Sequence, residues 1–310
     1  DCLESIGFVC DLRLLALNSY ENRVYQVGVE GAQPIIMKFY RHGRWTDAQI
    51  LEEHSFAREL VDHEISVVAP MRVSDKTLHH AHGQRFSVFE RRGGYPPELD
   101  NPDHLYRLGQ TLGRIHRIGR AKPFLHRRDI SSKRMATESR IFLEEQAVPS
   151  ELMNAYSTLA KDCEQTAASL LSTMTKRDMQ RVHGDCHTGN ILWRDDTPHF
   201  VDLDDCVSGP AIQDIWMFLS GDRFQQERQL SEFVSGYEEF HEFDSRQLAW
   251  IEALRTLRIM HHAFWLASRW DDPAFPRAFP WFGQARFWSD HILELREQLG
   301  LMQEPTLRLL

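Results

Sequence analysis

The chain lacks the features that would assign it to a membrane, an oxidising compartment or a nucleic acid. Its 310 residues contain no apolar run near the ~18 residues that a membrane-spanning helix needs. The five cysteines are scattered and none forms a C-x-x-C pair, which is typical of reduced thiols in a cytosolic protein. The formal net charge is −9 and no basic run is present, which argues against binding to nucleic-acid phosphates. We therefore expect a cytoplasmic protein with neither a membrane nor a nucleic-acid partner.

What is present fits a large globular protein in two parts. The hydrophobic content of 42% and the charged content of 26% are ordinary for a folded chain of this length. Residues 1–90 show strand patterns and one helix, whereas helical periodicity dominates residues 91–310. The Gly- and Pro-rich stretch Arg91–Pro97 is the expected joint. The sequence thus predicts an α+β fold with a small sheet-based N-lobe over 1–90 and a larger helical C-lobe over 91–310.

Local signals give the expected elements of each lobe. The sequence T-D-A-Q at Thr46 has the form of a capping box, so a helix should run from there to about Val61. Alternating apolar residues and turn signals predict strands near 24–29, 35–40, 67–72, 85–90, 191–193 and 199–203. Apolar residues at helical spacing predict helices near 105–116, 138–147, 150–172, 211–220, 227–241, 245–270 and 284–299.

The densest group of chemistry-bearing residues is the stretch H-G-D-C-H-T-G-N, which begins at His183. It has the form H-x-D-x-x-x-x-N, the spacing of a kinase catalytic loop, in which the Asp receives the proton of the attacking hydroxyl and the Asn holds a magnesium ion. A further carboxylate, Asp202, follows a short turn and an apolar strand, where a metal-binding Asp belongs. The pattern predicts a phosphotransferase that uses ATP and Mg²⁺, with Asp185 and Asp202 catalytic and Asn190 and Asp202 binding the metal.

Each of these residues also has a purely structural interpretation, because Asp and Asn are common in turns. A single D-x-x-x-x-N spacing would be weak evidence. Here a His precedes the Asp, an apolar strand follows the Asn, and a turn leads to a second apolar strand that ends at Asp202. This combination favours catalysis over unrelated turns. Cys186 lies inside the same motif, but nothing in the sequence indicates that its thiol pKa is lowered.

Three residues of the N-lobe are candidates for the nucleotide site. Lys38 lies late in the apolar strand I-I-M-K, which resembles the V-A-I-K strand of kinases; the alternative is an exposed lysine of an edge strand. Glu53 falls on the apolar side of the next helix, an unfavourable place for an unpaired carboxylate. We therefore expect a Lys38–Glu53 ion pair, with Glu52 as the alternative register. Ser19 lies in the glycine-free loop L-N-S-Y-E-N-R between the first two strands, where its hydroxyl could face the phosphates or simply form a turn.

Polar residues around the motif allow two interpretations each. His183 fits packing and hydrogen bonding, whereas His187 could touch the substrate or be solvated. Asp204 and Asp205 could approach a second metal or the acceptor, or form a charged loop. Asp214 opens an apolar helix and would either bind the backbone of the catalytic loop or favour the helix dipole.

The passages HGDCHTGNILW and FVDLDDCVSGPAIQDIWMFL resemble the aminoglycoside phosphotransferase and choline kinase superfamily. Together with LNSYENRVYQV, MKFYRHGRWT and WDDPAFPRAFPWF, they are similar to the bacterial stress response kinase A family (YihE/RdoA), from about residue 18 to residue 305. The resemblance implies a protein-kinase-like bilobal fold, ATP and Mg²⁺, transfer to Ser or Thr of proteins, and a role in stress survival. It implies that Asp185, Asn190, Asp202, Lys38 and, through the S-Y-E-N-R loop, Ser19 keep the roles given above.

Two other functions stay open. The first is a small-molecule kinase acting on homoserine, choline or an aminoglycoside-like acceptor, because that chemistry uses the same residues. Four tryptophans could suit a cationic ligand, although helix packing is the favoured interpretation: Trp265, Trp270, Trp281 and Trp288. The second is an inactive binding protein of kinase shape, against which the intact motif residues argue.

Overall fold

The computed structural model describes residues 1–17 and 19–310 of the chain. Asn18, which the sequence places in the expected phosphate loop, lies outside the described residues. Contacts divide the chain into two compact units, each made of separate stretches: unit 1 comprises residues 1–128, 180–243 and 309–310, and unit 2 comprises residues 129–179 and 244–308. The expected lobes, 1–90 and 91–310, follow different limits, and the lobe boundary stays a prediction.

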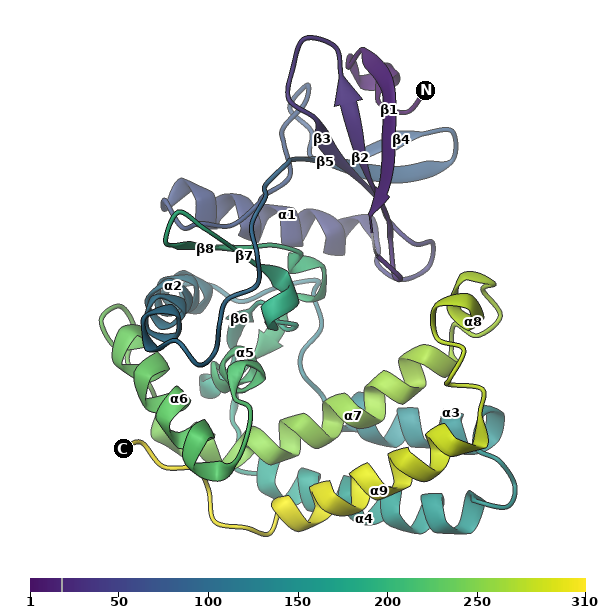
Figure 1. The fold of residues 1–310 in the computed structure, drawn as a ribbon, viewed down its shortest axis with the longest axis vertical. Coiled ribbons are helices and arrows are strands. Elements are labelled where there is room, and N and C mark those ends of the chain that lie inside the picture. The colour runs from purple at the N-terminus through teal and green to yellow at the C-terminus, as the bar shows by residue number, and fades with distance from the viewer. Residues whose placement is uncertain (18) are drawn as a thin grey trace. The chain divides into compact units, whose positions relative to one another are not determined.

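Unit 1 begins with a five-stranded antiparallel sheet of strand order β1-β2-β3-β5-β4 (Figure 1). The predicted hairpin is confirmed, because Val24 pairs with Lys38 and Val27 with Ile35. Buried apolar side chains on the sheet, among them Val27, Met37 and Phe86, form a small core. The strands are β1 (Cys10–Leu17), β2 (Arg23–Val29), β3 (Ile35–Phe39), β4 (His79–Ala81) and β5 (Gln84–Glu90).

The prediction of a strand near residues 67–72 is wrong. In the structure this stretch makes isolated bridges, from Val67 to Phe200 and from Pro70 to Phe89. Pro70 has no N–H group to donate to a ladder, which explains why the alternating pattern does not become a regular strand.

Helix α1 (Asp47–Asp62) begins where the capping box predicts. The hydroxyl of Thr46 accepts a hydrogen bond from the Gln49 backbone N–H, and the Gln49 side chain accepts one from the Thr46 backbone N–H at 2.9 Å. Its buried side carries apolar residues such as Ile50 and Phe56, and also Glu53. The helix therefore brings a carboxylate into the interior of unit 1.

The rest of unit 1 surrounds two short ribbons. Strand β6 (Gln180–Val182) pairs with β9 (Val207–Gly209), and β7 (Ile191–Arg194) pairs with β8 (Thr197–Phe200). The H-G-D-C-H-T-G-N motif lies between β6 and β7, and Asp202 follows β8. The helices are α2 (Pro102–Arg120), α5 (Ile212–Ile215) and α6 (Arg223–Tyr237), with short 3-10 turns at Glu4–Ile6, Thr188–Asn190, Leu203–Asp205 and Trp216–Phe218.

Helices α2 and α6 approach each other through glycines. A Cβ atom on Gly109 of α2 would lie 2.0 Å from the Phe233 carbonyl oxygen, and one on Gly236 of α6 would lie 2.1 Å from the Tyr106 carbonyl oxygen. No real Cβ contact is that short, so the two backbones can meet only where the side chain is a hydrogen atom. Helix α2 also packs against β6, the strand that precedes the H-G-D-C-H-T-G-N motif.

We expect Gly109→Ala to destabilise the protein by about 1–3 kcal/mol, because the added methyl group forces α2 away from α6. Gly300→Ala is the matched control: Gly300 lies in helix α9 (Ala285–Leu301), with open space around its Cα. There the same change should stabilise by up to about 1 kcal/mol through helix propensity. Thermal unfolding followed by circular dichroism measures both. A midpoint shift of the same sign in the two variants contradicts the packing argument.

Unit 2 is helical. Helix α7 (Ile251–Ala267) packs against α3 (Ser139–Gln146), α4 (Met153–Leu171) and α9, and the unit is rich in ring contacts. Trp288 is buried and lies 5.9 Å from Tyr156 between ring centroids, and Trp265 lies 5.1 Å from Phe275. These contacts support the packing interpretation of the tryptophans. The elements are a π-helix at Lys133–Glu138, α3 (Ser139–Gln146), α4 (Met153–Leu171), 3-10 turns at Lys176–Asp178 and Ser245–Trp250, α7 (Ile251–Ala267), α8 (Ala274–Ala278) and α9 (Ala285–Leu301).

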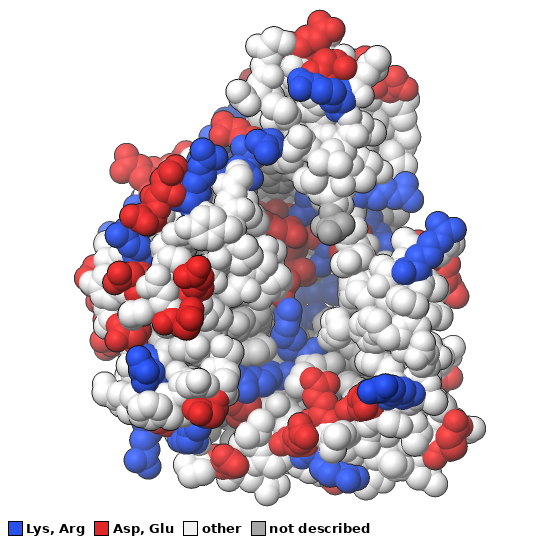
Figure 2. All heavy atoms as spheres, viewed as in Figure 1, with Lys and Arg blue, Asp and Glu red and all other residues white. Residues whose placement is uncertain are grey.

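The surface carries charges of both signs, in line with a sequence that has no basic run. Figure 2 shows acidic and basic side chains mixed over the face that it displays, without a continuous basic patch. Within residues 1–17 and 19–310, no helix is both long and apolar enough to cross a bilayer.

Candidate active site

The turn after β6 is held by one buried carboxylate. Asp214 of α5 accepts hydrogen bonds from the backbone N–H groups of His183 at 2.7 Å and Gly184 at 2.8 Å. Its Oδ2 also lies 3.0 Å from Nε2 of His116, a fully buried histidine of α2. Asp214 thus binds the catalytic-loop backbone, the first of its two expected roles, and the surrounding helices fix the start of the motif.

Hydrogen bonds then join the motif to the strand end that precedes Asp202. The Asn190 side-chain N–H donates to the Asp185 carbonyl oxygen at 2.9 Å, and Val201 N–H donates to the Asn190 carbonyl oxygen at 3.0 Å. His183 is buried, and its Nε2 donates to the Val201 carbonyl oxygen at 2.9 Å. His183 is therefore a packing and hydrogen-bonding residue, as the sequence predicts. Because the Asn190 nitrogen is used in this way, its amide oxygen is the atom left to bind a cation.

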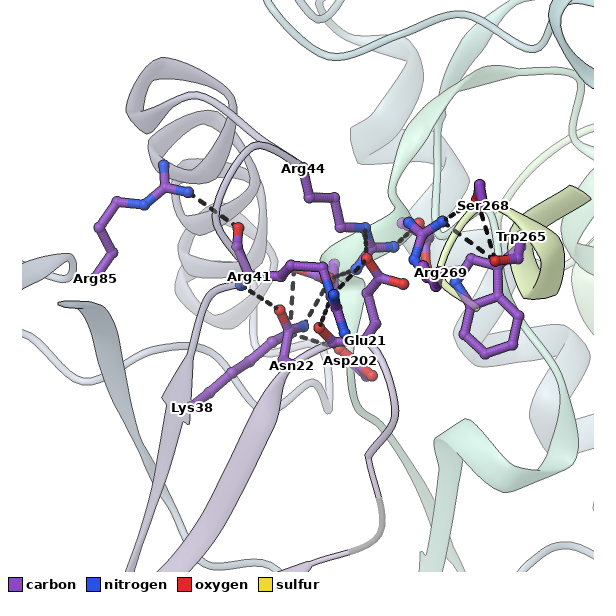
Figure 3. Close-up of polar contacts among 12 residues, drawn as sticks. Glu21, Asn22, Lys38, Arg41, Arg44, Arg85, Asp202, Trp265, Ser268 and Arg269 are labelled. Carbon is purple, nitrogen blue, oxygen red and sulfur yellow. Dashed lines mark hydrogen bonds and ion pairs between the residues drawn. The ribbon is translucent and has the colours of Figure 1, made fainter. Parts of the chain in front are cut away.

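Asp202 and Lys38 face each other across this part of unit 1 (Figure 3). Asp202 has a left-handed backbone with φ of 58°, a conformation that Asp tolerates better than most residues and that is concentrated at functional sites. Its side chain is 51% exposed, and its Oδ1 lies 2.7 Å from Nζ of the buried Lys38. Burial alone would lower the pKa of Lys38, but the carboxylates of Asp202, Asp204 and Glu53 outweigh it and hold the pKa well above its ordinary value.

The expected Lys38–Glu53 ion pair is absent from the described structure. The ammonium contacts Asp202 and Asp204 instead, at 2.7 and 3.3 Å. Glu53 is nevertheless buried, as its register on α1 predicts, and its Oε2 has no hydrogen-bond partner among the described atoms. The sequence suggested one carboxylate for Lys38, whereas the fold brings three near it, and the two from the segment after β8 reach the ammonium. Burial raises the pKa of Glu53 to about 7, although the charge of Lys38 opposes the shift.

This raised pKa predicts a pH dependence of stability. A folded-state pKa of about 7 against an ordinary value of 4.5 means that Glu53 stabilises the fold most below pH 4.5, and that this contribution is lost as the pH rises through 7. The Gln side chain of Glu53→Gln is neutral at every pH. The stability of this variant relative to wild type should therefore increase by roughly 1–3 kcal/mol when the pH is raised from 5 to 8. Unfolding midpoints of both proteins at the two pH values measure this gain. The neighbouring Glu52→Gln provides the control, and an equal gain in that variant contradicts the assignment to Glu53.

Asp204 is buried, rather than part of a solvated charged loop. Its Oδ2 accepts a hydrogen bond from the Asn22 side chain at 2.9 Å and a short one from Nη1 of Arg44. Arg44 also reaches Asp205 with Nη2 at 2.5 Å and Glu21 with Nε at 3.3 Å. Burial opposes ionisation of Asp204, but the charges of Lys38 and Arg44 hold its pKa below the usual range. Arg44 therefore joins the loop after β1 to the segment after β8, and Figure 3 shows its guanidinium beside Glu21.

Arg127 supports the same segment from behind. It is buried, donates to the backbone carbonyl oxygens of Asp204 and Cys206, and lies 3.9 Å from the centroid of the Trp45 ring. Glu52 of α1 in turn accepts backbone hydrogen bonds from residues 125, 126 and 127, at 2.5 to 2.8 Å. Glu52 therefore anchors a loop to α1 and does not pair with Lys38, which excludes the alternative register.

Sequence reasoning missed three contributors to this site: Asn22, Arg44 and Arg127. Asn is a common residue in turns, so Asn22 gives no distinctive signal, and the two arginines lie in loops where an arginine is usually solvated. One signal was available, because three carboxylates within Asp202–Asp205 after an apolar strand require several cations or polar donors nearby.

The remaining candidates are placed as follows. Ser19 lies in the loop between β1 and β2 and is partly buried. Cys186 is fully buried, and burial raises the pKa of its thiol, so it does not have the environment of a reactive cysteine. His187 lies beside Asp185, with Nε2 3.5 Å from Oδ2.

The chain is similar to known proteins over almost its whole length. The model of the family described as "Phosphotransferase enzyme family" matches residues 13–294. Stress response kinase A of Escherichia coli (strain K12) is 44% identical over 310 residues, which are 100% of this chain and 94% of the relative. Serine/threonine protein kinase RdoA of Salmonella typhimurium is 42% identical over 311 residues, with the same coverage. Among solved structures, the amicoumacin kinase hAmiN has a TM-score of 0.75 at 22% identity and covers 97% of this chain and 92% of its own.

The fold and the site define a phosphotransferase with a kinase-like α+β fold, in which an antiparallel sheet precedes a mainly helical part. The predicted fold class and the prediction of a kinase are therefore confirmed. The chain belongs to the phosphotransferase enzyme family and, within it, to the stress response kinase A family.

Proposed function

We propose that this protein transfers the γ-phosphoryl group of ATP, with Mg²⁺, to a Ser or Thr hydroxyl of a protein. The observation that carries the proposal is the meeting of three separate segments in unit 1. The catalytic loop of Asp185 and Asn190 is hydrogen-bonded to the strand end before Asp202, and Asp202 lies 2.7 Å from Lys38 of β3. A hydroxyl acceptor, a cation and a triphosphate each need one of these groups, and phosphoryl transfer needs all three aligned.

Asp185 is the group that orients the acceptor hydroxyl and accepts its proton. Its backbone is fixed by the Asn190 side chain, and its side chain is 24% exposed, so a substrate can reach the carboxylate. Phosphoryl transfer requires little covalent help from the protein, and positioning supplies most of the catalysis.

Asn190 and Asp202 would hold Mg²⁺, which prefers hard oxygen ligands and keeps several waters and phosphate oxygens in its shell. The two side chains offer suitable oxygen atoms. The amide oxygen of Asn190 is available because the amide nitrogen already donates a hydrogen bond, and the carboxylate of Asp202 is half-exposed. Residues 1–17 and 19–310 contain no group of three or more His, Cys, Asp or Glu side chains arranged for a metal. The bound ion would neutralise phosphate charge during transfer.

Lys38 would contact the α- and β-phosphates, because its buried ammonium already points at the metal-binding carboxylate. Glu53 provides a further negative charge near this ammonium, and Ser19 lies in the loop expected to cover the phosphates. A solved structure of similar fold, the amicoumacin kinase hAmiN, contains AMP-PNP and Ca²⁺, which supports nucleotide and divalent-cation binding by this fold.

The proposal that the acceptor is a protein rests on the names of the relatives. Those that match this chain end to end are named as a stress response kinase and a serine/threonine protein kinase. A role in stress survival follows from the same names. A cytoplasmic location fits the five cysteines, all of which are unpaired.

The test is incubation with labelled ATP and Mg²⁺, first alone and then with a generic basic protein, followed by phosphoamino-acid analysis. The proposal expects phosphoserine or phosphothreonine, on the added protein or on the kinase itself, and no labelling by Asp185→Asn. Efficient phosphorylation of homoserine, choline or an aminoglycoside without any protein labelling would replace it with a small-molecule kinase.

A further inference from the structure

We propose that His187 is a positioning residue, which holds the carboxylate of Asp185 in its working orientation through its Nε2–H group. The inference rests on the role proposed for Asp185 and adds a partner to it. His187 itself needs no contact with ATP or the acceptor for this role.

Hydrogen bonding fixes the tautomer of His187. The residue precedes the short 3-10 turn Thr188–Asn190, and its Nδ1 accepts the backbone N–H of Gly189 at 3.0 Å. A ring nitrogen that accepts a hydrogen bond carries no proton, so the neutral ring must carry its proton on Nε2. This Nε2–H group is the one that lies 3.5 Å from Asp185 Oδ2. The ring therefore presents a donor, and not a second acceptor, to the carboxylate.

The position of the ring is also fixed by its neighbour. A Cβ atom on Gly189 would lie 2.8 Å from Cε1 and 2.9 Å from Nδ1 of the His187 ring, so the ring packs directly on the glycine backbone. The packing and the Nδ1 hydrogen bond come from the same residue and restrain the ring from two directions. An imidazole held in this way can restrain a neighbouring group, although its side chain is 42% exposed.

A restrained donor beside Oδ2 limits rotation of the Asp185 carboxylate. The Asp185 carboxylate is then already oriented to accept the hydroxyl proton before the acceptor binds. Such alignment raises kcat more than it changes substrate affinity. His187 thus has two separable functions, a backbone cap through Nδ1 and an orienting contact through Nε2–H.

Two substitutions separate these functions. His187→Asn keeps a side-chain oxygen that can cap the Gly189 N–H, because Asn is a favoured cap, but it is too short to reach Asp185. His187→Ala removes both functions. We expect kcat to fall by roughly tenfold in both variants, with KM for ATP within about twofold of wild type and a lower unfolding midpoint only in His187→Ala. The readout is labelled phosphate released from ATP or transferred to a generic basic protein with Mg²⁺.

The double variant Asp185→Asn/His187→Asn tests whether His187 acts through Asp185. If it does, the second change adds nothing to the loss caused by the first. Wild-type kcat in His187→Asn, or losses that multiply in the double variant, would overturn the inference. An active Asp185→Asn variant would instead overturn the proposed function, so the two failures are distinguishable.

Discussion

Asp185→Asn is expected to lower kcat for phosphoryl transfer by roughly 10²–10⁴-fold, the usual worth of a positioned proton acceptor. The asparagine keeps the size of the side chain and leaves intact the backbone contact to Asn190, but it cannot accept the proton. Affinity for Mg-ATP should remain near wild type, because Lys38, Asn190 and Asp202 are unchanged. Activity within a few-fold of wild type would remove Asp185 from the mechanism.

Steady-state kinetics with labelled ATP measure the loss, and calorimetric titration of Mg-ATP into the variant measures the affinity. Asp195→Asn is a suitable control for a conservative Asp-to-Asn change, since its side chain is 89% exposed and lies in the turn between β7 and β8. The control should differ little from wild type in either measurement.

Asp202→Ala is expected to weaken Mg-ATP binding by tenfold or more, about 1.4 kcal/mol or greater, because it removes the carboxylate proposed to hold the metal. Its effect should depend on the cation. When Mg²⁺ is chelated, the same substitution removes a negative charge that lies 2.7 Å from the Lys38 ammonium, so the affinity for free ATP should be unchanged or higher.

Calorimetry with Mg²⁺ and with EDTA, on Asp202→Ala and on Asp185→Asn, decides this prediction. Asp202→Ala should be the weaker binder with Mg²⁺ and should lose that difference in EDTA. Equal Mg-ATP affinities in the two variants would shift the metal-binding role to Asp204 or Asp205. Equal weakening with and without Mg²⁺ would mean that Asp202 shapes the site without binding the metal.

The sequence predicted those parts of the structure that depend on near neighbours. The Thr46 capping box set the start of α1 within one residue, and the hairpin of β2 and β3 formed where alternation and the turn between them indicated. The spacing of Asp185 and Asn190 indicated one loop that carries both residues, and within that loop the Asn190 side chain donates a hydrogen bond to the Asp185 carbonyl oxygen. Such features are decided by backbone geometry over a few residues.

The arrangement of charges could not be predicted in the same way. Asn22 and Asp204 are 182 positions apart and Arg44 and Asp204 are 160 apart, and no local pattern records such pairings. The error over Lys38 has the same origin. The I-I-M-K strand and the register of Glu53 identified two buried charges correctly, but the choice of ion pair depended on a segment far along the chain.

The division of the chain into two discontinuous units constrains how the protein is made. Lys38 belongs to residues 1–128 and the catalytic loop to residues 180–243, and all of residues 129–179, which separate them, belong to unit 2. During synthesis the N-terminal part of the chain leaves the ribosome first, so the five-stranded sheet emerges long before β6 to β9. Unit 2 is complete only after α9 has been synthesised. No continuous half of the gene encodes the candidate site, and a nascent chain cannot assemble it until translation has passed residue 214, whose carboxylate holds the catalytic turn.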